Sequence, residues 1–343
     1  MKKRIISLAA AAVFVIGTLA GCGNSSTQTT DKTASSDASS SGGDLVTVRD
    51  AVMTGQLDQY ATEIGLWQGI FEKYGIDLQT TEFVAGINTI DAVVNGTADI
   101  GMMADYAAVN RLGNTLDATN LQIFSQISGG QSALSGGLYV DPKYADDPKS
   151  LDGSAGFMYQ EGTVTYYYAS KCIEYLGLDE SKQNLINTDS SQTRLALIQK
   201  GGASAVYANG SEAKYIEEAG WVQVATSQEI GIQTGSYFLS TDKYISENTD
   251  TLAKFLQAVD ESTQYINDHL DESAEYLADK LGLKAEDFKE NWKNYSFEPG
   301  FSEEATTHLE DIEKWGFEHG SFPKDYNVRD FINTDVAKIA FPD

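Results

Sequence analysis

Strand-like and helix-like segments alternate along this chain from Leu45 onward, and this alternation constrains the fold more than any other feature. Short apolar or β-branched runs, such as 46–48 and 99–103, precede segments with apolar residues at three- and four-residue spacing. Glycines end the helical segments, as Gly75 does after a helix expected over 61–74. Strands that alternate with helices predict a largely parallel sheet covered by helices. We therefore expect an α/β fold.

The same signals place the individual elements. We expect strands at 46–48, 76–80, 99–103, 121–127, 155–159, 203–208 and 237–239, helices at 61–74, 86–94, 104–112, 163–176 and 193–199, and long helices to about Gly320. The segment 92–100 resembles 196–205 if Lys200 is taken as an insertion, because each holds an apolar helix end, a glycine and the start of a buried strand. This repeat predicts two similar lobes with a cleft between them, a common place for a small ligand.

The N-terminus has the features of a secretion signal. Lys2, Lys3 and Arg4 precede an apolar run at 5–20 that is too short for a confident membrane span. Leu-Ala-Gly-Cys at 19–22 then leads into a polar Ser/Thr/Gly tract, and the whole resembles a bacterial lipoprotein signal. We expect residues 1–21 to be the signal peptide and 22–44 a tether with a lipid on Cys22. A flexible coil of that length reaches roughly 25 Å.

Charge and cysteine content narrow the partners. The formal net charge is −26, so the chain repels phosphate backbones and nucleic acid is excluded as a partner. An acidic surface also favours a monomer. If Cys22 carries lipid, Cys172 has no partner for an intramolecular disulfide. Its apolar helical surroundings favour a small buried hydrophobic residue over a nucleophile.

Several motifs resemble one family of transport proteins. The segments that carry the resemblance are IGLWQGIFEKYGIDL at 64–78, VNGTADIG at 94–101, PKSLDG at 148–153 and QEGT at 160–163. Together they are similar to motifs of the solute-binding proteins of ABC importers for sulfonates, taurine, nitrate and thiamine-precursor pyrimidines, the NMT1/THI5-like group. Two departures are Ser204, where that family usually has Asp, and Met-Ala-Asp-Tyr at 103–106, which replaces small neutral residues.

The resemblance implies a two-lobed periplasmic-binding-protein fold of type II. Each lobe would hold a mixed, mostly parallel sheet flanked by helices, with extra C-terminal helices. Residues 45–138 and 237–343 would form lobe 1 and 139–236 lobe 2, with hinge segments near 136–142 and 232–236. It also implies an extracytoplasmic lipoprotein anchored to the cell membrane, which closes on a small solute and delivers it to an ABC permease.

The family holds its ligand in loops that follow strands and begin helices. The residues that we expect there are Met53, Gln56, Asp58, Asn88, Thr89, Met103, Asp105, Tyr106, Tyr159, Gln160, Thr163 and Asn209. Three helix N-termini, near 87, 163 and 190, would point unpaired N–H groups at the cleft. Asn88, Thr89 and Thr163 could add neutral donors, or simply cap their helices.

These loops contain carboxylates but no lysine or arginine, which disfavours a strongly anionic ligand held by arginine. We predict a small zwitterionic or amino-bearing solute that meets Asp105 and stacks on Tyr106, Tyr159 or Tyr166. A taurine-like sulfonate, an aminopyrimidine-like precursor and an unrelated amine all fit.

Enzymatic function is disfavoured by the motifs. The sequence has no nucleophile elbow, Walker loop or dinucleotide fingerprint, and its three histidines are dispersed. We expect neither catalysis nor a cofactor or metal. A surface sensory lipoprotein with the same fold is the alternative to transport.

Overall fold

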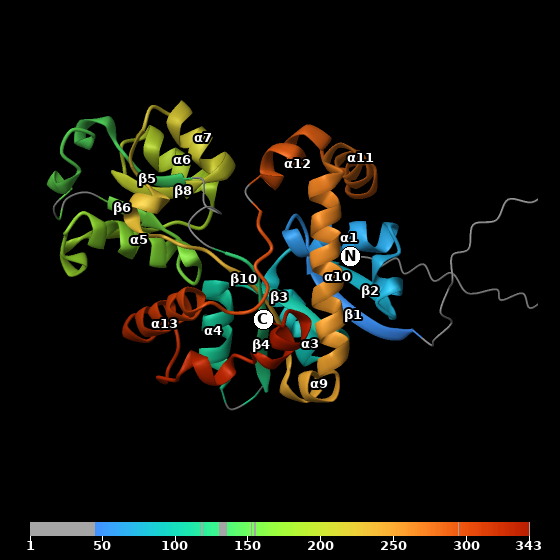
Figure 1. The fold of residues 1–343 in the computed structure, drawn as a ribbon. Helices are drawn as coiled ribbons and strands as arrows, with labels where there is room; N and C mark the ends of the chain where they lie inside the picture. The colour runs from blue at the N-terminus through green and yellow to red at the C-terminus, as the bar shows by residue number, and fades with distance from the viewer. Residues whose placement is uncertain are drawn as a thin grey trace, which may run out of the picture. The chain divides into compact units, whose positions relative to one another are not determined.

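The computed structural model describes residues 45–342, apart from 117, 119, 130–135, 152, 154–155 and 294. The predicted signal peptide, the tether and Cys22 lie outside the described residues. The strands form two five-stranded sheets, which we call sheet A and sheet B. Each sheet is mixed and flanked by helices, as predicted (Figure 1).

Sheet A has the strand order β2-β1-β3-β10-β4. Its strands are β1 (Val46–Met53), β2 (Ile76–Phe83), β3 (Ile100–Ala104), β4 (Leu121–Ser128) and β10 (Ser236–Thr241). β1 pairs in parallel with β2 and β3, whereas β10 pairs antiparallel with β3 and β4. The carboxyl ends of β1, β3 and β4 therefore share one edge of the sheet with the start of β10.

Sheet B has the order β7-β6-β8-β5-β9. Its strands are β5 (Gly136–Val140), β6 (Gly156–Tyr159), β7 (Asn184–Asn187), β8 (Ala205–Asn209) and β9 (Val222–Thr226). β6 pairs in parallel with β7 and β8, and β5 pairs antiparallel with β8 and β9. Each sheet thus has two parallel and two antiparallel pairings among the described strands, more antiparallel pairing than the sequence predicted.

The two sheets have the same internal arrangement, which supports the predicted repeat. In each, one strand pairs antiparallel between the third and fourth of the other four strands: β10 lies between β3 and β4, and β5 lies between β8 and β9. The helix ends before β3 and β8 also match, because Asn95 and Lys200 are right-handed C-cap residues and Gly96 and Gly201 have positive φ. The predicted insertion at Lys200 is therefore wrong, since Lys200 is equivalent to Asn95.

Helices cover the sheets close to the predicted positions. Those before β10 are α1 (Leu57–Trp67), α2 (Ile70–Lys73), α3 (Gly86–Val94), α4 (Asp105–Thr115), α5 (Val164–Tyr175), α6 (Ser191–Gln199), α7 (Gly210–Glu218) and α8 (Ser227–Ile230). Short 3₁₀ turns lie at Pro142–Tyr144, Pro148–Ser150, Glu180–Lys182 and Val328–Phe331. The single helix predicted over 61–74 is instead two, because Gly69 takes a left-handed conformation with φ 68°.

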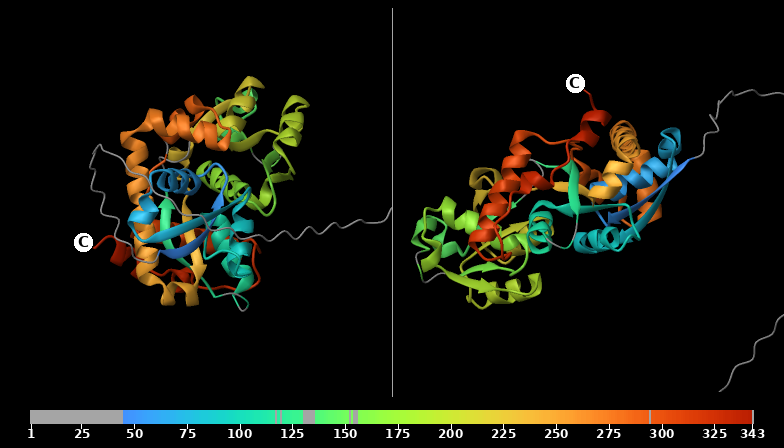
Figure 2. Two further views of the ribbon diagram at one scale, coloured as in Figure 1. Left: turned by 90° about the vertical axis from the view of Figure 1, so that its right-hand side faces the viewer. Right: turned by 90° about the horizontal axis from the view of Figure 1, so that it is seen from below.

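The last third of the chain is helical, as predicted. It contains α9 (Asp242–Glu247), α10 (Thr249–Asp268), α11 (Leu270–Leu281), α12 (Ala285–Trp292), α13 (Glu303–Glu318) and α14 (Asp335–Ala340). α10 is amphipathic and buries Leu252, Phe255, Leu256 and Val259 at helical spacing. It packs beside α1, as both views in Figure 2 show. No helix in the described part of the chain is long and apolar enough to span a membrane.

The chain passes between the sheets twice. It leaves sheet A at Ser128 and enters sheet B at Gly136, and it returns between Ile230 and Ser236. The first hinge segment predicted at 136–142 is misplaced, because 136–140 forms the central strand β5. The second, at 232–236, lies where the chain returns to sheet A. The division into lobes at 138/139 falls inside β5 and stays a prediction.

Candidate functional site

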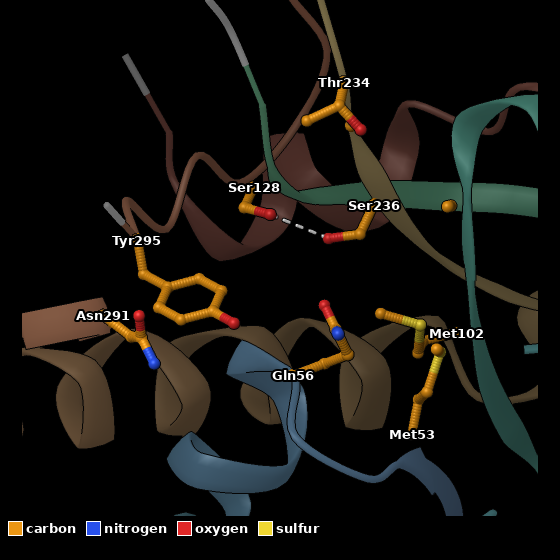
Figure 3. Close-up of a pocket in the computed structure, with 10 residues that line it drawn as sticks. Met53, Gln56, Met102, Ser128, Thr234, Ser236, Asn291 and Tyr295 are labelled. Carbon is orange, nitrogen blue, oxygen red and sulfur yellow. Dashed lines mark hydrogen bonds between the residues drawn. The ribbon is translucent and has the colours of Figure 1, made fainter. Parts of the chain in front are cut away.

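A cavity of about 310 Å³ opens at the edge of sheet A where β1, β3 and β4 end. The residues that line it are Met53, Gln56, Met102, Ala104, Ser128, Thr234, Gly235, Ser236, Asn291 and Tyr295 (Figure 3). Ligands of open α/β sheets commonly bind beyond the carboxyl ends of the strands, because loops and helix N-termini converge there. We call this the first cavity.

The walls of the first cavity are uncharged but rich in hydrogen-bonding groups. Among the described residues that line it, none has an acidic or basic side chain. The hydroxyls of Ser128 and Ser236 form a hydrogen bond to each other at 2.8 Å. The Tyr295 hydroxyl donates a hydrogen bond to the Gly55 carbonyl at 3.2 Å. The amide of Gln56 lies between Tyr295 and the two methionine thioethers in Figure 3.

Asp58 lies directly behind this cavity, at the first turn of α1. Its side chain is fully buried, and its Oδ2 accepts a hydrogen bond from the backbone N–H of Met53 at 3.0 Å. Its Oδ1 has no partner in the described part of the protein. Burial raises the pKa of Asp58 to about 7. Burial, with the nearby charge of Asp58, also raises the pKa of Asp50.

A second cavity of about 560 Å³ lies between helix N-termini of both sheets. It is lined by Ala85, Gly86, Ile87, Met103, Ala104, Tyr106, Ala107, Asn110, Arg111, Asn114, Thr115, Gly162, Thr163 and Val164. The predicted residues Met103, Tyr106 and Thr163 therefore share one cavity. The sequence missed Arg111, which points here from α4 and pairs with Asp91 at 2.7 Å.

A third cavity, of about 600 Å³, lies at the end of sheet B. Its lining consists of Gln160, Glu161, Gly162, Asn187, Thr188, Asp189 and Thr193. Gly162 lines both this cavity and the second one, and Ala104 lines both the second and the first. Neighbouring cavities in this series thus share a lining residue. Two carboxylates, Glu161 and Asp189, stand at the sheet B end.

The sequence predicted that the Asp105 carboxylate contacts the solute, but the structure places it away from the cavities. Its side chain is 1% exposed and lines none of these three cavities. The Oδ2 of Asp105 accepts a hydrogen bond from the Gly235 N–H at 3.0 Å and also lies 2.7 Å from His308 Nε2. The Oδ1 accepts a hydrogen bond from the Tyr106 N–H at 2.7 Å. The carboxylate is therefore occupied by the protein itself, and it ties α4 to α13 and to the segment before β10.

Of the remaining predicted residues, some line a cavity and others do not. Thr89 is fully buried and bonds to the Met102 carbonyl at 2.6 Å, so it serves the fold. Asn88 and Asn209 are exposed, and neither lines a cavity described above. Tyr159 packs against Tyr166 with ring centroids 4.6 Å apart, and Gln160 lines the third cavity.

Two lining residues that the sequence did not predict come from the C-terminal third. Asn291 lies in α12 and Tyr295 just beyond it, more than 230 residues from Met53. Tyr60 of α1 contacts the rings of Phe288, Trp292 and Tyr295 at 5.0, 6.5 and 6.2 Å, which holds this segment against the cavity. The close spacing of aromatic residues over 288–295 was the available signal.

The described residues offer no metal centre, since no group of three or more His, Cys, Asp or Glu is placed to hold an ion. Cys172 is a free, buried thiol whose pKa is raised by burial, in agreement with a structural role.

Solved structures share this fold. The aliphatic sulphonate binding protein SsuA from Escherichia coli superposes with a TM-score of 0.70 at 16% identity, covering 83% of this chain and 97% of its own. The nitrate-binding protein NrtA from Synechocystis PCC 6803 gives 0.59 at 15% identity, covering 86% and 88%. A Candida albicans gene product, described as having the generic periplasmic binding protein fold, gives 0.60 at 17% identity, covering 84% and 97%. A search of curated sequences found no match.

The fold is the one that these solved structures share, the periplasmic-binding-protein fold. The model of the NMT1/THI5-like family matches residues 64–273, and the chain belongs to that family. The resemblance predicted from the sequence is thereby confirmed. Two of the three structures above are named for the solutes that they bind.

Proposed function

We propose that this protein is the extracytoplasmic solute-binding component of an ABC importer, anchored by a lipid on Cys22. Its cargo is a small amino-bearing solute, captured in the cavities between the two sheets. The family, the fold and the N-terminal signal support this role.

Two observations support this cargo: none of the described residues that line the first cavity has a cationic side chain, and a buried carboxylate lies behind it. A strongly anionic solute would need charge-assisted donors to replace its hydration. Asp58, when ionised, instead stabilises an amine or a ring with donor N–H groups. The nearby acid is therefore Asp58 and not Asp105, whose carboxylate is occupied by the protein.

The shape of the first cavity favours a flat head group. The thioethers of Met53 and Met102 lie on one side and the Tyr295 ring on the other (Figure 3). Sulfur and aromatic surfaces both make favourable contacts with π systems. The amides of Gln56 and Asn291 supply paired donors and acceptors. An amino-heterocycle such as an aminopyrimidine uses all of these groups, and therefore ranks ahead of a taurine-like sulfonate.

Binding between two sheets that are joined by two chain crossings suits a hinge mechanism. A solute that contacts both sides shifts the population towards a closed form, and the permease recognises that form. Delivery then requires only that the permease bind the closed form more tightly than the open one.

The first experiment is a thermal-shift screen of the processed protein against aminopyrimidines, taurine, alkanesulfonates, nitrate and polyamines. A ligand present at 100 times its Kd should stabilise the protein by ~2.7 kcal/mol, a rise in Tm of several degrees. Small-angle scattering of the same complex should show a smaller radius of gyration, because the hinge closes.

Tyr295→Ala should abolish the aminopyrimidine response, while Tyr215→Ala, on exposed α7, should leave it unchanged. Stabilisation by sulfonate or nitrate alone would contradict the proposed cargo. Ligand binding without any change in scattering would contradict the closure mechanism.

A further inference from the structure

Ala104 stands where the first and second cavities meet. It lines both of them, its small side chain is exposed, and it is the N-cap residue of α4 with φ −70° and ψ 157°. Any residue adopts these backbone angles without strain. The size of the side chain at this position therefore controls the passage between the two cavities, without a structural requirement for alanine.

The two cavities differ in how their polar groups are used. In the first, the side-chain amides of Gln56 and Asn291 have no hydrogen-bond partner among the described residues. In the second, Asn114 donates to Asn110 and to the Ser321 carbonyl, and Arg111 pairs with Asp91 through one terminal nitrogen, while its buried Nε has no partner among the described residues. The first cavity thus has polar groups free for a ligand.

Thr163 in the second cavity is also occupied, because its hydroxyl donates to the Gln160 carbonyl at 2.8 Å and accepts from the Thr165 N–H. Apart from these polar groups and the Arg111 Nε, the surface of the second cavity is largely apolar and comes chiefly from Ile87, Met103, Ala107 and Val164. Ile87 is 42% exposed, a high value for an isoleucine at the rim of a cavity. Such a surface gains free energy when an apolar group covers it.

We propose that the site has two compartments and takes an elongated solute, with a hydrogen-bonding head in the first cavity and an apolar substituent in the second. Ala104 is the residue that determines specificity, because it sets the width of the junction. The proposal rests on the proposed function for the head group. To the proposed function it adds the apolar substituent of the ligand and the residue, Ala104, whose size lets that substituent enter the second cavity.

The four methionines after Met1 provide a built-in assay. Met53 and Met102 line the first cavity, Met103 lines the second, and Met158 is buried in β6 away from all three cavities. In protein labelled with ¹³C at the methionine methyls, each compartment has its own NMR signal. Met158 serves as the internal control.

The probes are 4-aminopyrimidine, its alkyl derivatives from methyl to hexyl, and 1-hexanol. 4-Aminopyrimidine and its short-chain derivatives should shift the methyl signals of Met53 and Met102. The longer-chain derivatives should also shift the methyl signal of Met103. Affinity should rise about fourfold per added methylene until the second compartment is filled. 1-Hexanol, which lacks the head, should shift Met103 while Met158 stays unchanged.

Ala104→Leu narrows the junction between the two cavities. The variant should therefore still bind 4-aminopyrimidine and its short-chain derivatives, but its affinity should no longer rise with the length of the alkyl chain. The control Ala219→Leu, at the exposed end of α7, should behave as the wild type. The proposal is overturned if Met103 responds to neither hexyl derivative nor 1-hexanol, or if both variants keep the full gain. A response of Met103 to 1-hexanol, with Met53 and Met102 silent towards every head, supports the apolar compartment and refutes the proposed head group.

Discussion

Two carboxylates near the site have opposite environments. Asp105 has both oxygens bonded within the protein, whereas Asp58 keeps one buried oxygen without a described partner. An unpaired buried carboxylate resists ionisation because the protein interior solvates charge poorly. A nearby cation would therefore favour the ionised form of Asp58. A cationic ligand should bind more tightly as pH rises through about 7 and Asp58 ionises.

The raised pKa of Asp58 also affects stability. Its ordinary value is 3.8, and burial raises it to about 7, so the folded protein holds this proton more tightly than the unfolded chain. The resulting stability is fully present below pH 3.8 and is lost as pH rises towards 7.

Asp58→Asn keeps the acceptor for the Met53 N–H but does not titrate. Between pH 5 and pH 8 the wild type loses the stability that comes from the Asp58 proton, and the variant does not. The free energy of unfolding of the variant minus that of the wild type should therefore rise by about 2–3 kcal/mol over this range. Urea unfolding at both pH values measures this difference, with Glu275→Gln on exposed α11 as the control. A constant difference across the range would show that Asp58 ionises as freely in the folded protein as in the unfolded chain.

At the scale of elements, α13 joins parts that belong to different sheets. Trp315 of α13 is 9% exposed, and its ring lies 6.0 Å from Tyr106 of α4 and 5.0 and 5.4 Å from Tyr166 and Tyr167 of α5. Its indole Nε1 has no partner among the described residues, so the contact is one of packing. α13 is therefore held on both sides by one aromatic side chain.

Trp315→Ala should lower the free energy of unfolding by about 3–5 kcal/mol, because it leaves a cavity among these rings. Trp315→Phe should cost less, since no hydrogen bond is lost. Phe317→Ala, on the same helix and 41% exposed, should change stability by less than about 0.5 kcal/mol. Thermal unfolding followed by circular dichroism provides the comparison. Equal losses for Trp315→Ala and Phe317→Ala would contradict this role.

At the scale of the whole molecule, the proposed anchor and the acidic surface act together. A net charge of −26 is repelled by an anionic membrane, so attachment depends on the lipid and not on the surface of the protein. Cys22→Ser should therefore release the protein from the membrane fraction and abolish incorporation of labelled fatty acid. Cys172→Ser should do neither, because that thiol is buried. Retention of the Cys22→Ser protein in membranes after a salt wash would contradict lipid anchoring.

The sequence predicted elements well where the signal was local. Helix α3 ends where Asn-Gly at 95–96 predicted, and most strands lie within a few residues of their expected positions. It missed the break at Gly69, because glycine permits several conformations, and the strand β5, because its pairing partners β8 and β9 lie far along the chain. Asp105 was misjudged for the same reason, since its partners Gly235 and His308 are 130 and 203 residues away.

The sequence by itself determined the α/β class, the family, the repeated helix–glycine–strand unit and the acidic character of the chain. These properties depend on periodicity and composition over short stretches. Only the tertiary structure decided which polar groups face the first cavity. Met53, Ser128, Ser236 and Tyr295 meet there because β10 inserts between β3 and β4 and because an aromatic cluster holds the segment after α12 against α1. Such convergence depends on long-range packing, which no local pattern records.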